Sequence, residues 1–419
     1  MKTRLKHLLL PRALSVFIAL LRMMRTVGIV PVDPFSVMVL PPWSPGSIGD
    51  EAVMRTAIAQ LRKLGFKMIT LIAYEPNESW GHVGELDSLF DLQAFFKHQT
   101  WRSQMTFAQR VSRCAQFYVF GTDMMDGFYG EQLSVDRATL AGLAARVGVR
   151  TQIVSISFNN TPTPGSVSAL RALPAAVRIT ARDPISHERL VRIIQRPIEL
   201  AADVAFLLEP ETDSQTVKTT LDWVRAQKAM GRTVVGVNVN HLLLRHVPGL
   251  TPEQLACTHA RAIEELIAQN AQLSFLMVPH DVRDEVSDVS LARDVLADLP
   301  AELKPYAMQV PSPFHAPDIK AIVAELDIVL SGKMHLAIAC FGRSTPVACV
   351  VYQDKFEGLF RHFELSGLTL DPSLVAQPGQ LSGFLGPHIQ HRDAVQAHIQ
   401  RKLPHVLQLA QLNFVPPAS

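Results

Sequence analysis

The sequence predicts an α/β protein whose two halves each hold a parallel sheet, and three stretches carry this prediction. Residues 318–367 read as helix, strand, sharp turn, helix, strand and helix, with apolar residues at the matching spacings. Residues 36–73 read as strand, glycine-containing turn, helix and strand, which is a βαβ unit. An apolar run at 234–237 follows a charged helix and starts a second half. Short apolar strands that alternate with helices are typical of a parallel sheet covered on both faces.

The other elements follow from the same rules, because apolar runs bounded by Gly or Pro predict strands and apolar residues at helical spacing predict helices. In the first half we expect strands at 36–40, 68–73, 117–120, 152–156 and 177–180, helices after Asp50 and at 140–147, and an insertion with one or two helices at 75–113. In the second half we expect strands at 234–237, 274–278, 328–330 and 347–352, and helices at 253–270, 319–323, 334–340 and 392–412.

This order divides the 419 residues into five segments. They are an N-terminal extension (1–34), a first α/β domain (35–208), a crossover linker with a helix (209–231), a second α/β domain (232–390) and a C-terminal helix and tail (391–419). Two domains of ordinary size fit this length.

Composition excludes some classes of protein. The net charge of +2 at pH 7 gives no global field that would indicate nucleic acid or a membrane as partner. The four cysteines show no CxxC pair and no histidine at zinc-ligand spacing. We therefore expect no structural metal, and a reduced, cytoplasmic protein.

The N-terminus resembles a signal peptide in part, since Lys2, Arg4 and Lys6 precede an apolar run. Pro11-Arg12 splits that run, however, and no small-residue cleavage site follows. No later run reaches membrane-spanning length. A helix resting on a domain or on the cytoplasmic face of the inner membrane fits better, and the low net charge favours the first of these.

Lys333 and His335 stand at the turn between a buried strand and the next helix. Open α/β sheets bind ligands at the carboxyl ends of their strands, and helix N-termini favour anions. A positive charge and an imidazole at this place indicate a phosphate or carboxylate site with an acid/base group beside it. The alternative is a surface lysine and a histidine with structural hydrogen bonds.

Several separated motifs, spread from Ser44 to Leu365, resemble the polysaccharide pyruvyl transferase family. In order along the chain they are Ser47-Ile48-Gly49-Asp50-Glu51, Arg182-Asp183 with Ser186, Asp203 with Phe206 and Leu207, His280-Asp281, and Ser331, Lys333, Met334 and His335 followed by Gly342, Pro346, Tyr352 and Lys355. The chain departs from the family pattern at Lys333, where Arg is usual, and at Ser47, where Asn is usual. The first departure matters because lysine is a point charge and cannot form the bidentate fork of arginine.

The resemblance implies a glycosyltransferase-B-like fold, in which two Rossmann-like domains face each other across a cleft, the first on the acceptor side and the second on the donor side. It also implies a transferase that moves a pyruvyl group from phosphoenolpyruvate to sugar hydroxyls of a cell-surface or extracellular polysaccharide precursor and forms a pyruvate ketal. The expected partners are this small donor and a sugar or lipid-linked glycan, with no nucleic acid, no metal and no cofactor. Peripheral contact with the inner membrane is compatible with such an acceptor.

By resemblance, His335 donates the proton and contacts the donor, whose phosphate and carboxylate Arg182 and Lys333 bind. Asp50 or the His280–Asp281 pair accepts the hydroxyl proton. Further candidates for the cleft are Ser47, Gly49, Tyr352 and Lys355. Two structural alternatives stay open: Asp50 as a helix cap, and Arg182 in an ion pair with Asp183 or Glu188.

Two rival functions also remain. A glycosyltransferase with a nucleotide-sugar donor would have the same fold, although Glu325 and Glu357 stand in no convincing donor motif. A non-catalytic sugar-binding relative would account for the departures at Lys333 and Ser47.

Overall fold

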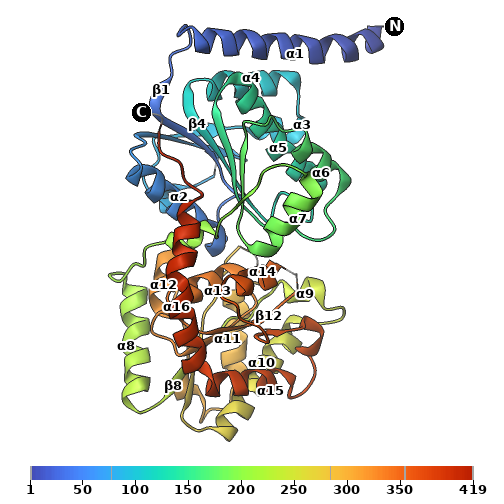
Figure 1. Cartoon of the computed structure of the whole chain (residues 1–419). Coiled ribbons are helices and arrows are strands. Elements are labelled where there is room, and N and C mark those ends of the chain that lie inside the picture. The colour runs from blue at the N-terminus through green and yellow to red at the C-terminus, as the bar shows by residue number, and fades with distance from the viewer. Residues whose placement is uncertain (1, 77, 284, 353–354, 418–419) are drawn as a thin grey trace. The chain divides into compact units, whose positions relative to one another are not determined.

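Strands of the described chain form two sheets, and neighbouring strands in both pair in parallel (Figure 1). The computed structural model describes residues 2–76, 78–283, 285–352 and 355–417, with side chains from residue 13 onward. Contacts divide the chain into two units. One comprises Met1–Pro45, Met54–Val204 and Leu409–Ser419, and the other comprises Gly46–Val53 and Ala205–Gln408.

The first unit holds a seven-stranded sheet in the order β3-β2-β1-β4-β5-β6-β7. Its strands are β1 (Asp33–Leu40), β2 (Met68–Ala73), β3 (Ser88–Asp91), β4 (Cys114–Thr122), β5 (Arg150–Ile156), β6 (Arg178–Ala181) and β7 (Glu199–Leu200). The helices that begin among them are α1 (Lys2–Thr26), α2 (Ile48–Lys63), α3 (Gln93–His98), α4 (Trp101–Val111), α5 (Glu131–Val147), α6 (Pro164–Arg171) and α7 (Pro184–Ile194).

The second unit holds a six-stranded sheet in the order β10-β9-β8-β11-β12-β13. Its strands are β8 (Thr233–Val237), β9 (Leu273–Met277), β10 (Ala307–Gln309), β11 (Ile328–Ser331), β12 (Val347–Val350) and β13 (Thr369–Leu370). Its helices are α8 (Gln215–Ala229), α9 (Leu243–His246), α10 (Pro252–Gln269), α11 (Asp288–Asp298), α12 (Ala316–Val323), α13 (Met334–Phe341), α14 (Lys355–His362), α15 (Gln380–Gln390) and most of α16 (Arg392–Gln411). In both sheets the chain runs outward from a central strand and then restarts on its other side, which is the Rossmann order.

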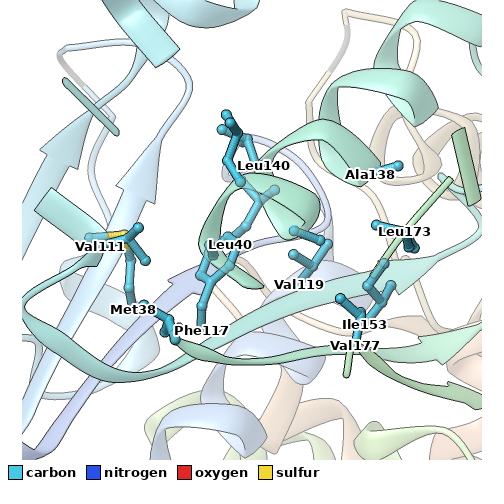
Figure 2. Packing of buried hydrophobic residues seen from close by; sticks show 14 of the residues in the cluster. Met38, Leu40, Val111, Phe117, Val119, Ala138, Leu140, Ile153, Leu173 and Val177 are labelled. Carbon is cyan, nitrogen blue, oxygen red and sulfur yellow. The ribbon is translucent and has the colours of Figure 1, made fainter. Parts of the chain in front are cut away.

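Each sheet is covered by apolar side chains of its helices. Figure 2 shows this in the first unit, where Met38, Leu40, Phe117, Val119 and Ile153 of the strands pack with Val111, Ala138, Leu140, Leu173 and Val177. Their side chains are buried, and burying one large apolar side chain stabilises a fold by about 1.5–3 kcal/mol. A separate cluster, which includes Val235, Phe275 and Leu330, fills the second unit. Each unit therefore has a core of its own.

Local sequence signals set the helix ends. Asp183 caps α7, since its carboxylate accepts a hydrogen bond from the Ser186 amide at 2.7 Å. Thr251 and Gln254 form a capping box at the start of α10. Gly148, with φ at 94°, ends α5 in the left-handed region that glycine adopts without strain.

The two ends of the described chain lie on the first unit. Helix α1 packs against α4 and α5. After α16, the Asn413 amide donates to the Ala202 carbonyl at 2.7 Å, and Gln116 donates to the Pro416 carbonyl at 2.8 Å. Of the described helices, none combines the length and apolar character that crossing a membrane requires.

The structure differs from the expectations in three places. Residues 75–113 contain α3 and α4, but they also contain β3, which extends the first sheet beyond β2. The segment 209–231 holds the expected helix, α8, but it groups with the second unit rather than forming a separate linker. Residues 46–53, which we placed in the first domain, also group with the second unit.

Candidate functional site

The candidate site lies at the carboxyl ends of three adjacent strands of the second sheet, β9, β8 and β11. Strand β8 is the topological switch point, because the chain continues from it to β9 on one side and later returns to β11 on the other. The residues that follow these three strands are mostly polar and buried: Asn238, Asn240 and His241 after β8, His280 and Asp281 after β9, and Gly332 and Lys333 after β11. The sheet topology therefore brings together residues that are up to about a hundred positions apart.

Asp288, the first residue of α11, connects these strand ends. One carboxylate oxygen accepts from the His241 amide at 3.2 Å and from His241 Nδ1 at 2.8 Å. The other accepts from Asn238 Nδ2 at 2.9 Å and from the His280 amide at 3.1 Å. Burial acts to raise the pKa of Asp288, but the charge of Lys333 and the hydrogen bond from His241 outweigh it, so the pKa is lowered. Asp288 is thus an ionised carboxylate in the interior.

Lys333 is the N-cap residue of α13, and its ammonium group faces two carboxylates. Its Nζ lies 3.3 Å from Asp281 Oδ2 and 3.8 Å from Asp288 Oδ1. Arg283 holds Asp281 from a second direction through both carboxylate oxygens, at 3.0 and 2.7 Å. Burial again acts to raise the pKa of Asp281, but Arg283 and Lys333 reverse the effect and lower it. Two cations therefore face two ionised carboxylates, and their charges balance.

His280 stands out in this cluster because its side chain has no partner. The residue is 4% exposed, and within the described chain neither ring nitrogen has a hydrogen-bond partner. Burial lowers the pKa of His280 to about 3, and the nearby charges of His335 and Lys333 add to this effect. The ring is therefore neutral at physiological pH. A buried polar group without a partner costs about 1–3 kcal/mol, so this imidazole is suited to bind a ligand.

The Ser47–Glu51 motif joins the site through the second unit. Ser47 forms an isolated antiparallel bridge with Asp281. Gly49 lies against His335 so closely that a Cβ atom at Gly49 would be 2.3 Å from His335 Nδ1. Glu51, 5% exposed, lies 3.2 Å from His315 Nδ1. The absence of a side chain at residue 49 thus allows the first turn of α2 to pack on the imidazole.

The remaining predicted residues of the second unit are Asp50, Tyr352 and Lys355. Asp50 is half-buried in the first turn of α2, and its amide lies 3.4 Å from Ser47 Oγ. Tyr352, after β12, stacks on His246 with ring centroids 4.4 Å apart. The Nζ of Lys355 lies 5.9 Å from the centroid of the Tyr352 ring.

Arg182 belongs to the first unit, where it follows β6. Its guanidinium pairs with Asp203 at 3.0 Å, and each side chain is 1% exposed. The structural alternative named Asp183 or Glu188 as the partner, and the structure adds an ion pair with Asp203. Asp183 caps α7. The assignment of Arg182 to the donor stays a prediction, and its burial in an ion pair favours a structural role.

Sequence reasoning missed Asp288, His241 and Arg283. Asp288 follows a Ser that caps a helix, so the sequence reads as an ordinary solvated helix start. His241 follows Asn240 directly, and the Asn-x-Asn-His run after a strand was the available signal. Among the described residues, no group of three or more His, Cys, Asp and Glu side chains is arranged to hold a metal ion.

Several solved structures have a similar fold. UDP-GlcNAc 2-epimerase from Neisseria meningitidis, bound to UDP-GlcNAc, has a TM-score of 0.55, 10% identity and coverage of 90% of this chain and 97% of its own. MnaA from S. aureus, solved with UDP, has a TM-score of 0.59, 10% identity and coverage of 90% and 94%. HepE from Anabaena, solved with UDP and glucose, has a TM-score of 0.52, 13% identity and coverage of 90% and 97%. At this identity the likeness concerns the fold alone, and it confirms the predicted glycosyltransferase-B-like class.

No curated protein matches the chain. The family model for polysaccharide pyruvyl transferase matches residues 48–354, which is more than half of the chain and contains the strand-end residues described above. The chain therefore belongs to the polysaccharide pyruvyl transferase family.

Proposed function

We propose that this protein transfers a pyruvyl group from phosphoenolpyruvate to hydroxyls of a polysaccharide precursor and forms a pyruvate ketal. The observation that supports this most is the buried, unpartnered imidazole of His280 next to Lys333, at the switch point of the second sheet. A small anion with a phosphate and a carboxylate would give His280 a hydrogen-bond partner and would lie near the positive charge of Lys333. Membership of the family supports pyruvyl transfer as the reaction class.

In this proposal the donor lies against Lys333 and His280, and His335 acts as the acid. His335 gives a proton to the methylene carbon of the enol, and positive charge develops at the neighbouring carbon. An acceptor hydroxyl adds to that carbon and loses its proton to a base. A second hydroxyl then displaces phosphate and closes the ketal.

Asp50 is the better candidate for the base. The pKa of Asp281 is lowered, and the carboxylate is bound by Arg283, so it accepts a proton poorly. The pKa of His280, at about 3, makes that imidazole a weak base as well. Asp50 follows Gly49, which contacts His335, and is half-buried. A general base must lie within hydrogen-bond reach of the hydroxyl, and a residue directly after Gly49 is a candidate for that position.

The acceptor in this proposal is a sugar or a lipid-linked glycan of a cell-surface or extracellular polysaccharide, and the reaction needs no metal or cofactor. A cytoplasmic location is part of the proposal. The four cysteines, all free in the structure, support a reducing compartment. Arg182 is retained as a donor ligand to be tested, with the ion pair to Asp203 as the alternative.

Nucleotide-sugar binding is the second candidate, since two proteins of similar fold were solved with UDP-GlcNAc and with UDP. Thermal shift with phosphoenolpyruvate and with UDP-GlcNAc separates the two, because a ligand that binds the native state stabilises it by mass action. We expect phosphoenolpyruvate to raise the melting temperature. A shift with UDP-GlcNAc alone would favour a glycosyltransferase, and binding without turnover would favour a non-catalytic relative.

Phosphate release with a sugar acceptor tests the assignment of His335. Replacing His335→Ala should lower the rate by about 100- to 10,000-fold, the usual contribution of a positioned acid, and leave the melting temperature unchanged. His405→Ala, at an exposed histidine of α16, is the matched control and should keep the rate. Near-normal phosphate release by the His335→Ala variant would refute the assignment.

A further inference from the structure

Helix α1 has an inner face that is fixed to the first unit. Ile18 and Leu21 are buried and belong to the core cluster of that unit. The guanidinium of Arg25 donates to the Ser112 carbonyl at the end of α4. The orientation of α1 about its own axis is therefore set by packing, and its opposite face is directed away from the core.

The opposite face is apolar although it is exposed. Val16, Leu20, Met23 and Val27 are 68%, 48%, 55% and 62% exposed. Their spacing of four, three and four residues places them on one side of the helix and of the turn that continues it. We call these four residues the α1 stripe. A contiguous exposed apolar patch of this kind marks an interaction surface.

The N-terminal segment that carries the stripe is basic in its sequence. Residues 1–32 contain six basic residues and no Asp or Glu, whereas the whole chain has 40 Lys and Arg against 38 Asp and Glu. The six are Lys2, Arg4, Lys6, Arg12, Arg22 and Arg25. The chain as a whole is nearly neutral, but its N-terminal segment is basic.

We propose that α1 docks the protein on an anionic membrane surface, with the α1 stripe in the interface between lipid headgroups and acyl chains. Apolar side chains combined with Lys and Arg are the pattern of helices that lie in this interface. Anionic headgroups attract basic segments and so complement the charge of this end. A second copy of the chain would bring two basic ends together, which opposes pairing through the stripe. This proposal does not depend on the donor or the acceptor.

Flotation of the full chain with lipid vesicles tests the proposal. We expect binding to vesicles of phosphatidylglycerol and phosphatidylcholine in equal parts, weaker binding in high salt, and little binding to phosphatidylcholine alone. Replacing Val16→Glu together with Met23→Glu should lower the vesicle affinity at least about tenfold. Replacing Lys2, Arg4 and Lys6 by Gln should weaken binding and reduce its salt dependence.

The matched control is Val191→Glu with Met230→Glu, since these two apolar residues are also exposed, at 42% and 56%, but lie outside α1. This variant should bind vesicles as the parent does, and all variants should keep the parent melting temperature. Equal vesicle binding by the stripe variant and the parent would overturn the proposal, as would failure of the parent to bind anionic vesicles. Concentration-dependent dimers that the stripe substitutions abolish, without vesicle binding, would assign the stripe to a second copy.

Discussion

Single residues around Lys333 determine which charge the site can accept. Lys333 and Arg283 face Asp281 and Asp288, both held ionised by lowered pKa values. A dianionic donor therefore meets a balanced cluster and needs further positive charge. Within the described cluster, protonation of a histidine can supply such charge near neutral pH, because imidazole is the side chain whose ordinary pKa lies there.

We expect donor binding to be coupled to proton uptake by His280. In the free protein its pKa is lowered to about 3, so the ring is neutral near neutral pH. A bound dianion favours the imidazolium and raises this pKa in the complex. Because the complex then binds more protons than the free protein, donor affinity should increase as pH falls, by at most about tenfold per pH unit for one proton.

Isothermal calorimetry in buffers of different ionisation enthalpy measures this proton uptake directly. His280→Asn keeps a polar side chain of similar shape but cannot take up a proton, and it should lower the uptake. The phosphate of the donor also titrates, and the proton uptake that remains in the His280→Asn variant measures that contribution. Unchanged uptake in His280→Asn would assign the proton to another group, such as His335.

At the scale of elements, the first turns of α2 and α13 pack closely because residue 49 is a glycine. Gly49→Ala would place a Cβ atom 2.3 Å from His335 Nδ1 and 2.9 Å from its Cβ, so the imidazole must move. A displacement of about 1 Å can lower a rate by about 100-fold, and we expect a loss of this size in turnover. Overpacking should also lower stability by about 1–3 kcal/mol.

Gly383→Ala in α15 is the matched control. It is a helical glycine of the same unit at which an added Cβ would meet nothing within 4 Å, so turnover should stay normal. Combining Gly49→Ala with His335→Ala should recover part of the lost stability, because the ring is then gone while the Cβ atom of residue 335, 2.9 Å away, remains. Normal turnover by Gly49→Ala alone would show that the position of the imidazole is unimportant for the reaction.

The sequence allowed most strands and helices to be predicted, because runs such as Met68–Ala73 and Ile328–Ser331 are apolar, short and bounded by breakers. Strand β3 escaped prediction since Ser88–Asp91 is a short edge strand of which half the residues are exposed. In the site, His280, Asp281 and Lys333 could be placed at strand ends, and the structure brings them together. Asp288 could not be predicted as a site residue. Its carboxylate faces Asn238 and His241 because of the way α11 packs, which the local sequence does not reveal.

At the scale of the whole molecule, the chain exchanges segments between its two units. Residues 46–53 leave the first unit to complete the site of the second, and residues from Leu409 onward return to the first. The family motif around Gly49 is thus far in sequence from Lys333 and His335 but belongs to the same unit. Residues that are far apart in the sequence can therefore belong to the same unit of this protein.

Hydrogen exchange with phosphoenolpyruvate tests which unit binds the donor and what Arg182 does. If the donor binds at the cluster around Lys333, protection should increase in peptides covering 46–53, 238–241, 280–283 and 331–335, because these segments form the site. Peptides covering Arg182 and Asp203 should stay unchanged if that buried pair is structural. Increased protection around Arg182 as well would instead support its assignment to the donor, and Arg182→Lys should then weaken binding because lysine cannot form the bidentate contact. Protection confined to the first unit would place the donor away from Lys333 and contradict the proposed site.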